Sequence, residues 1–256
     1  MRFTGVADAY DQAATAWRAG PEAVYARLAD ALIGTAAVPL RGARVLDAGA
    51  GTAVASRVAM DRGAHVVATD ISVGMLNQRH QRVSAVCADV VQLPFDDDVF
   101  QLVIAAFCLG HLDNPAGALE EMRRVGSALV ASAFAPGWTH PAKSIVDDVM
   151  TGFGFVVPDW YTHVKENLEP AVNNPAALSH LARVAGFDDV TVQRIDVDSG
   201  LTSPAEIVNW RLGMAHLAPF AAALPPDVLQ SARTEAEAAV NGVGPVVIPI
   251  LALSAS

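Results

Sequence analysis

The feature that most constrains the fold is a nine-residue stretch at 45–53, Val-Leu-Asp-Ala-Gly-Ala-Gly-Thr-Ala. Its apolar start predicts a buried strand, its glycines predict a tight turn, and the apolar spacing over 52–62 predicts a helix. Gly49 and Gly51 lack the Cβ atom that would block the turn or the close approach of a ligand to the backbone. This order of elements indicates an α/β fold in which the helix N-terminus faces a negatively charged or carboxylate-bearing ligand.

A second strand is predicted over 65–69, and it ends on Asp70, nineteen residues after Gly51. An acid at that place is positioned to accept hydrogen bonds from both hydroxyls of a ribose. The glycine spacing is Gly49-x-Gly51-x-Ala53, with Asp47 before the first glycine. It differs from the Gly-x-Gly-x-x-Gly of dinucleotide-binding folds, so the spacing disfavours a nicotinamide cofactor.

These motifs resemble those of the class I S-adenosylmethionine-dependent methyltransferases, in particular the small-molecule enzymes of the ubiquinone and menaquinone methyltransferase type. The similarity covers about residues 1–197 and the last strand, and later motifs such as Leu-Pro-Phe at 93–95 follow in the family's order. Ala53 departs from the pattern, because the family usually has a third glycine there. The resemblance implies a Rossmann-like, doubly wound α/β fold with a seven-stranded, mainly parallel sheet, and S-adenosyl-L-methionine as cofactor.

The resemblance also assigns cofactor contacts to residues at the ends of the predicted strands. Asp70 would bind the ribose, while Ile71 and Met75 would pack against the adenine. Asp89, after a third strand over 83–87, would accept the adenine amino group, and Val90 would donate its backbone N–H. Because the carboxyl ends of parallel strands share one edge, these positions should converge. The cofactor-binding candidates are Tyr10, Asp47, Ala48, Gly49, Gly51, Asp70, Ile71, Met75, Asp89, Val90 and Ala106, the last in a fourth strand over 100–107; core packing explains Tyr10 nearly as well.

Two histidines are candidates for a catalytic role. His111 follows the fourth strand, and His140 lies in an inserted segment. Histidine suits general base catalysis near neutral pH, but methyl transfer to an ionised oxygen or a free amine needs only positioning. The sequence contains no cluster with metal-ligand spacing and no Gly-x-Ser-x-Gly motif. Metal and acyl-transfer chemistry are therefore not expected.

Composition excludes several other classes of protein. The net charge of −10 disfavours a nucleic acid partner. No run of 18 apolar residues lacks charge, glycine or proline, so no membrane span is expected, and no signal pattern begins the chain. Cys87 and Cys108 lie in apolar runs and are predicted to be buried free thiols in a reducing compartment. These observations favour a cytoplasmic protein.

The length of 256 residues fits one methyltransferase domain over 1–256. Helices are expected within the N-terminal segment 1–35, and the fifth strand is expected over 128–134. Two segments, 136–173 and 198–244, exceed what the sheet needs, and the second separates the expected strand pair 188–197 and 246–254. We interpret both as cap insertions over the cofactor's methyl group. Surface elaboration or the contact of a homodimer is the alternative.

The expected activity is methyl transfer to the oxygen, nitrogen or carbon of a small, partly apolar molecule, such as one of secondary metabolism. One alternative is a cyclase or pericyclic catalyst that uses the cofactor structurally, and another is a binding module that senses S-adenosylmethionine. Acceptor contacts are expected from the N-terminal helices and from 136–173 and 198–220. The large residues of the two inserted segments are Trp138, Phe153, Phe155, Trp160, Tyr161, Trp210 and Met214.

Overall fold

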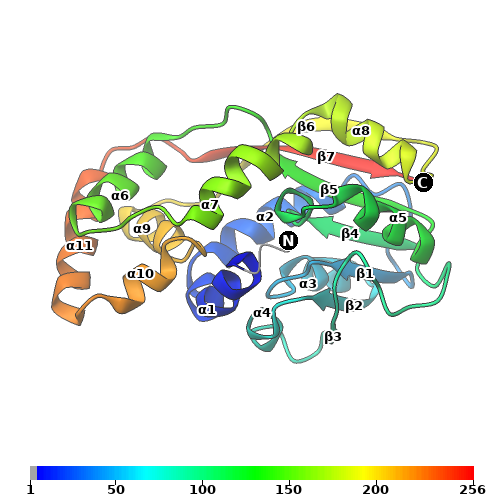
Figure 1. The fold of residues 1–256 in the computed structure, drawn as a ribbon, viewed down its shortest axis with the longest axis horizontal. Helices are drawn as coiled ribbons and strands as arrows, with labels where there is room; N and C mark the ends of the chain where they lie inside the picture. Colours follow the sequence, from blue (N-terminus) through cyan, green and yellow to red (C-terminus); the bar gives the residue numbers. More distant parts are fainter. Residues whose placement is uncertain (1–4) are drawn as a thin grey trace.

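The central strands of the sheet bury apolar side chains on both faces, whereas its two edge strands are largely exposed. In the computed structural model, which describes residues 5–256, its order is β3-β2-β1-β4-β5-β7-β6 (Figure 1). Strands β1 to β5 pair in parallel, whereas β7 pairs antiparallel with both β5 and β6. The strands are β1 (Arg44–Ala48), β2 (His65–Asp70), β3 (Ser84–Cys87), β4 (Leu102–Ala106), β5 (Leu129–Phe134), β6 (Thr191–Asp198) and β7 (Val247–Ala255). The predicted seven-stranded, mainly parallel α/β sheet is confirmed.

Helices cover both faces of this sheet and give each its own hydrophobic core. On one face, α5 (Pro115–Val125) and α8 (Pro175–Val184) bury Leu119 and Leu178 against β1, β4 and β5. On the other face, α2 (Pro21–Ile33) and α3 (Val54–Asp61) bury Leu32 and Ala59 against β1, β2 and β4. Parallel strands read as continuous apolar runs because both of their faces are covered in this way.

Predicted helix starts are formed by the side chains that the sequence supplies. The Ser72 hydroxyl accepts the Met75 N–H at the start of α4 (Val73–Asn77), and Asn114 caps α5 by accepting the Gly117 N–H. A capping box between Ser203 and Glu206 begins α9 (Pro204–Leu212). Each of these bonds satisfies a backbone N–H that has no partner within its own helix.

The two inserted segments contain five helices that lie beyond the sheet, on the left of Figure 1. Three of them, α6 (Pro141–Gly152), α9 and α11 (Pro226–Ala239), pack on one another around buried Val146, Trp210 and Ala236, and α9 also contacts α2. The helix α1 (Gly5–Ala19) contacts α7 (Asp159–His163) and α10 (Ala218–Ala223), so these helices cover its outer side. Short helical turns lie at Leu109–His111, Val164–Leu168 and Glu169–Ala171.

The prediction that both cysteines are buried is wrong for Cys87. This residue ends β3, which is the edge strand of the sheet, and it is exposed there. Its apolar neighbours Val83 and Val86 suggested a buried strand, but an edge strand has no neighbour on its outer side. Cys108 is partly buried. Within residues 5–256 no helix is both long and apolar enough to cross a membrane.

Candidate cofactor and acceptor site

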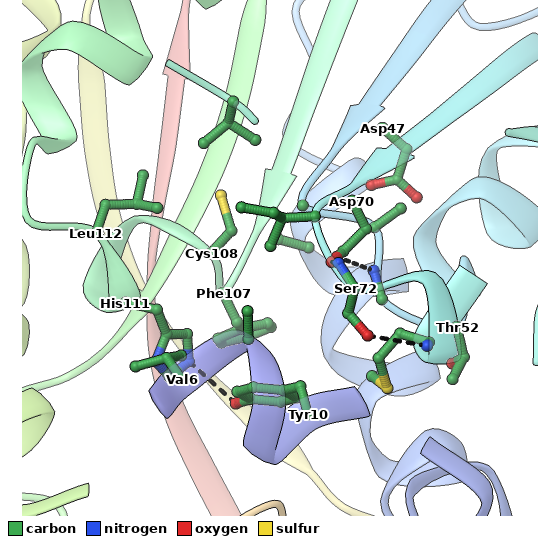
Figure 2. A pocket seen from close by; sticks show the side chains of 18 of the residues that line it. Val6, Tyr10, Asp47, Thr52, Asp70, Ser72, Phe107, Cys108, His111 and Leu112 are labelled. Atoms are coloured by element: carbon green, nitrogen blue, oxygen red, sulfur yellow. Dashed lines mark hydrogen bonds between the residues drawn. The ribbon is translucent and has the colours of Figure 1, made fainter. Parts of the chain in front are cut away.

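A cavity of about 670 Å³ opens at the carboxyl ends of the central strands, where the chain order reverses between β1 and β4. Such an edge is where doubly wound folds bind ligands. Figure 2 shows Asp47, Asp70 and Ser72 on one side of it and Phe107, His111 and Leu112 on the other, with α1 crossing below. The N-terminal helices therefore cover a site that the strand ends build.

The turn after β1 has a left-handed backbone. The φ angles of Gly49, Gly51 and Ala53 are +70°, +56° and +59°. A Cβ atom on Gly49 would lie 2.5 Å from the Cβ of Cys108, so only glycine fits there. Ala53 adopts the left-handed conformation at the start of α3. Its methyl group is the smallest side chain that carries this strain, so the fold is kept.

Asp70 links the ends of the first two strands. One carboxylate oxygen accepts the Gly51 N–H and the other accepts the Ser72 N–H, each at 2.8 Å. Burial raises the pKa of Asp70, while these two bonds oppose the shift. A carboxylate oxygen can accept more than one hydrogen bond, so Asp70 still has acceptor capacity toward the cavity that it lines.

Asp47 is a fully buried acid that also lines the cavity. One of its oxygens, Oδ2, accepts the backbone N–H and the hydroxyl of Ser56, at 2.8 and 2.6 Å. The other oxygen, Oδ1, is buried without a hydrogen-bond partner among residues 5–256. Burial raises the pKa of Asp47 to about 6. An unpartnered carboxylate oxygen in this position fits a ligand with a positive charge.

His111 and Tyr10 join the sheet edge to the first helix. The Tyr10 hydroxyl lies 3.1 Å from Nε2 of His111, and the dashed line in Figure 2 marks this bond. Burial, with a smaller effect of the Lys165 charge, lowers the pKa of His111 to about 4. The imidazole is therefore neutral at pH 7 and a weak base, because a general base works best with a pKa near the working pH. The geometry suits positioning of α1 better than proton transfer.

The structure brings most of the predicted residues to one cavity. Its lining includes His111 and ten of the eleven cofactor candidates, namely Tyr10, Asp47, Gly49, Gly51, Asp70, Ile71, Met75, Asp89, Val90 and Ala106. Ala48 is not among them, because its side chain is buried in the sheet core. The placement of His140 does not support its predicted catalytic role. Its Nδ1 accepts the Ala142 N–H and caps α6, away from the cavity lining.

An aromatic wall on the far side of the cavity was missed by the sequence analysis. It consists of Trp17, Tyr25, Phe107 and Phe134, and neighbouring rings lie 4.7 to 5.4 Å apart between centroids. Phe107 follows β4 directly and Phe134 ends β5, so their places after two central strands were the available signal. Such rings offer an apolar and rigid surface to a ligand.

The expectation that large residues of the inserted segments line the acceptor site is not met. None of the seven named residues lies in the cavity lining. Phe155 and Trp210 are buried in the core formed by α6, α9 and α11, and Trp160 packs on the outside of α1. The apolar character of a residue indicates that it packs in the fold, but it does not show against which element. In the described part of the chain, no group of three or more His, Cys, Asp or Glu could hold a metal ion.

Comparison with known proteins places the chain among methyltransferases. Residues 46–128 match the family described as "Methyltransferase domain". A curated relative, the demethylmenaquinone methyltransferase of Clavibacter sepedonicus, is 37% identical over 207 residues, which cover 73% of this chain and 81% of the relative.

Solved structures share the fold of this chain. One, described as a methyltransferase of an antibiotic biosynthesis pathway in Anabaena variabilis, has a TM-score of 0.65 at 16% identity and covers 90% of this chain and 96% of its own. The [4+2]-cyclase SpnF has a TM-score of 0.54 at 20% identity, with 90% and 81% covered. At these identities the likeness establishes the fold alone, and the same fold carries different reactions.

Proposed function

The chain belongs to the class I S-adenosylmethionine-dependent methyltransferases and resembles the menaquinone methyltransferases, and from that premise we propose that it methylates a small quinol-like aromatic molecule bound against Phe107 and Phe134. Transfer of a methyl group from S-adenosylmethionine to a small molecule is the activity of this family. The observation that carries the proposal is one continuous cavity, which runs from Asp47 and Asp70 to the aromatic wall. Cofactor and acceptor thus share one cavity.

The residues at the strand ends fit the cofactor. Asp70 binds the ribose hydroxyls, supported by its remaining acceptor capacity and its place after β2. Oδ1 of Asp47 faces the positively charged part of the cofactor, supported by its burial without a partner among the described residues. Gly49 and Gly51 leave room for close approach, and Met75 and Ile71 supply apolar contacts to the adenine.

The acceptor occupies the aromatic end of the cavity. The relative at 37% identity is named for demethylmenaquinone, and a quinone-like ring matches the flat surfaces of Phe107, Phe134 and Tyr25. A mainly apolar pocket with few polar groups binds such a ring and fixes its orientation. The neighbouring rings Phe107 and Phe134, which both line the cavity, tilt by 31° to each other with their centroids 4.8 Å apart.

Orientation and exclusion of water are the contributions of the chain's own residues. When bound, S-adenosylmethionine supplies a methyl group on a positively charged sulfur, which makes that carbon electrophilic. The Tyr10–His111 hydrogen bond holds α1 over the cavity and keeps water out. Because His111 is neutral and a weak base, it positions Tyr10 and does not take a proton from the acceptor.

Product analysis with a quinol probe tests this proposal. The protein is incubated with S-adenosylmethionine and chemically reduced 1,4-naphthoquinone, and both products are quantified by mass spectrometry. We expect methylated naphthoquinol and S-adenosylhomocysteine in equal amounts, and no S-adenosylhomocysteine without the probe. Methylated product would exclude the sensor alternative. A cyclase or sensor predicts cofactor binding without any S-adenosylhomocysteine, and this result across quinol, phenol and amine probes would overturn the proposal.

Cofactor affinity should rise with pH through the titration of Asp47. The pKa of Asp47 is raised to about 6 in the protein, so below pH 6 its carboxyl is mostly protonated and gives a cation little attraction. We expect the Kd of S-adenosylmethionine to fall from pH 5 to pH 7 and then to level off. For each unit by which cofactor binding lowers the pKa of Asp47, the Kd should fall by up to about tenfold.

Asp47→Asn is the matched variant for this pH dependence. It should show a flatter profile, with the affinity at pH 7 reduced toward that of the wild type at pH 5, measured by calorimetry. Burial of an ionised Asp47 costs stability as the pH rises from about 4 through 6, because the folded pKa lies above the unfolded one. The variant without cofactor should therefore melt at the same or a higher temperature at pH 7. An unchanged pH profile would contradict the placement of Asp47 beside a cation.

A further inference from the structure

Both lysines of the chain lie behind the aromatic wall. The sequence has 17 basic residues, and Lys143 and Lys165 are its only lysines. Nζ of Lys165 lies 6.0 Å from the ring centroid of Phe134, which lines the cavity. Nζ of Lys143 lies 4.4 Å from the ring of Trp138, and that ring stacks on Phe134 at 6.0 Å and 17°. The helix α6 and the helical turn Val164–Leu168, whose lysines are 22 residues apart, thus place their ammonium groups near Phe134 and Trp138, outside the cavity lining.

A buried arginine from the second insertion completes this cationic cluster, which we define as Lys143, Lys165 and Arg211. Arg211 is 2% exposed, and its Nη2 donates to both carboxylate oxygens of Asp147 at 2.8 Å. Its Nε is buried and has no partner among residues 5–256. His216 contacts the same guanidinium at 3.3 Å, but burial lowers its pKa to about 2, so this histidine adds no charge.

The charges of the cluster do not cancel. Lys165 pairs with Glu169 at 2.5 Å and Arg211 pairs with Asp147, whereas Lys143 makes no ion pair within the described chain. Burial, followed by the charges of Arg211 and Lys165, lowers the pKa of Lys143 only to about 8, so it stays mostly charged at pH 7. Three cations against two acids leave one net positive charge, in a protein whose own net charge is −10.

An uncompensated, partly buried ammonium is costly unless a partner supplies the opposite charge. Lys143 and Trp138 do not line the cavity, but Trp138 stacks on Phe134, which does, and Lys143 lies over Trp138. An acceptor that extends past the Phe134 ring is therefore directed toward this charge. One unbalanced positive charge matches a singly charged carboxylate better than a doubly charged phosphate. Partial burial beside the Trp138 ring lowers the effective dielectric constant and strengthens the attraction between the two charges.

We propose that Lys143, supported by Lys165 and Arg211, binds a carboxylate carried by the aromatic acceptor, and so makes aromatic acids the preferred substrate class. This inference rests on the proposed function, because the acceptor ring must lie against Phe134 for its carboxylate to reach Lys143. In this proposal the inserted segments contribute to acceptor selection through cations that lie next to the aromatic wall but outside the cavity lining.

Two probes of nearly equal size, one charged and one neutral, test whether the charge of the acceptor determines its affinity. The carboxylate of 6-hydroxy-2-naphthoate is compared with the neutral 6-hydroxy-2-naphthamide, which has almost the same size, by calorimetry on the protein saturated with S-adenosylhomocysteine at pH 7. We expect the acid to bind at least tenfold more tightly than the amide. Lys143→Met should reduce this preference to within twofold, and Lys143→Arg should retain most of it. Arg194→Met, which removes an exposed charge on β6, should leave it unchanged.

Each outcome decides between the two proposals. Equal binding of acid and amide to the wild type, or an unchanged preference in a folded Lys143→Met variant, overturns the carboxylate site and leaves the proposed methyl transfer intact. Binding of neither probe also overturns the carboxylate site. Failure of S-adenosylhomocysteine itself to bind would instead contradict the proposed function. A thermal melt of each variant verifies that it is folded.

Discussion

Replacing Asp70 by alanine is expected to weaken the binding of S-adenosylmethionine by about 10- to 150-fold, corresponding to about 1.5–3 kcal/mol. The carboxylate is a charged acceptor for the ribose hydroxyls, and it also holds the N–H groups of Gly51 and Ser72 at 2.8 Å. Its loss removes the ligand contact and frees the turn that the cofactor approaches. Titration calorimetry with S-adenosylmethionine measures the change.

Asp148→Ala is the matched control, because it removes an acid from the exposed side of α6, outside the cavity lining. Its affinity should equal that of the wild type. Asp70→Asn should lie between the wild type and Asp70→Ala, since an amide oxygen still accepts hydrogen bonds but carries no charge. If a folded Asp70→Ala protein binds the cofactor as the wild type does, the ribose lies elsewhere and the placement of the cofactor fails.

Replacing Trp210 by alanine is expected to destabilise the protein by roughly 3–5 kcal/mol and to leave cofactor affinity unchanged in the folded fraction. Trp210 is 3% exposed in the core between α6, α9 and α11, which does not line the cavity. Denaturant unfolding measures the loss, and calorimetry under folding conditions measures the affinity. Trp160→Ala, at a half-buried position against α1, should cost less.

Together, the variants Trp210→Ala and Trp160→Ala test whether the core of the inserted segments is energetically independent of the cofactor site. A folded Trp210→Ala protein that loses cofactor affinity would show that the core of the insertions and the strand ends are coupled. A loss of stability no larger than that of Trp160→Ala would show that this core does not hold the insertions together.

The central fold and the strand-end residues could be predicted because their signals are local. The turn at Gly49 and Gly51 and the acid at position 70 follow directly after apolar strands, and parallel strands bring their carboxyl ends to one edge. Helix starts at Ser72, Asn114 and Ser203 were equally visible, since each side chain caps its own helix.

The rest of the site depends on contacts between distant segments. Tyr25 and Phe134 are 109 residues apart, and only the packing of α2 against β5 brings their rings to one wall. The cap formed by His140 was not expected, because histidine is not among the usual N-cap residues. The scarcity of lysine was present in the sequence, but the meeting of Lys143 with Arg211 requires two insertions to fold together.

The crystal structure of the protein with S-adenosylhomocysteine tests the central claim most directly. The account predicts the nucleoside in the cavity at the ends of β1, β2 and β4, with both ribose hydroxyls within hydrogen-bond distance of Asp70. It also predicts that the amino group of the ligand lies on the side of Asp47, and that the face of Phe134 remains free for the acceptor. Density for the nucleoside outside this cavity, or a ribose without contact to Asp70, would contradict it.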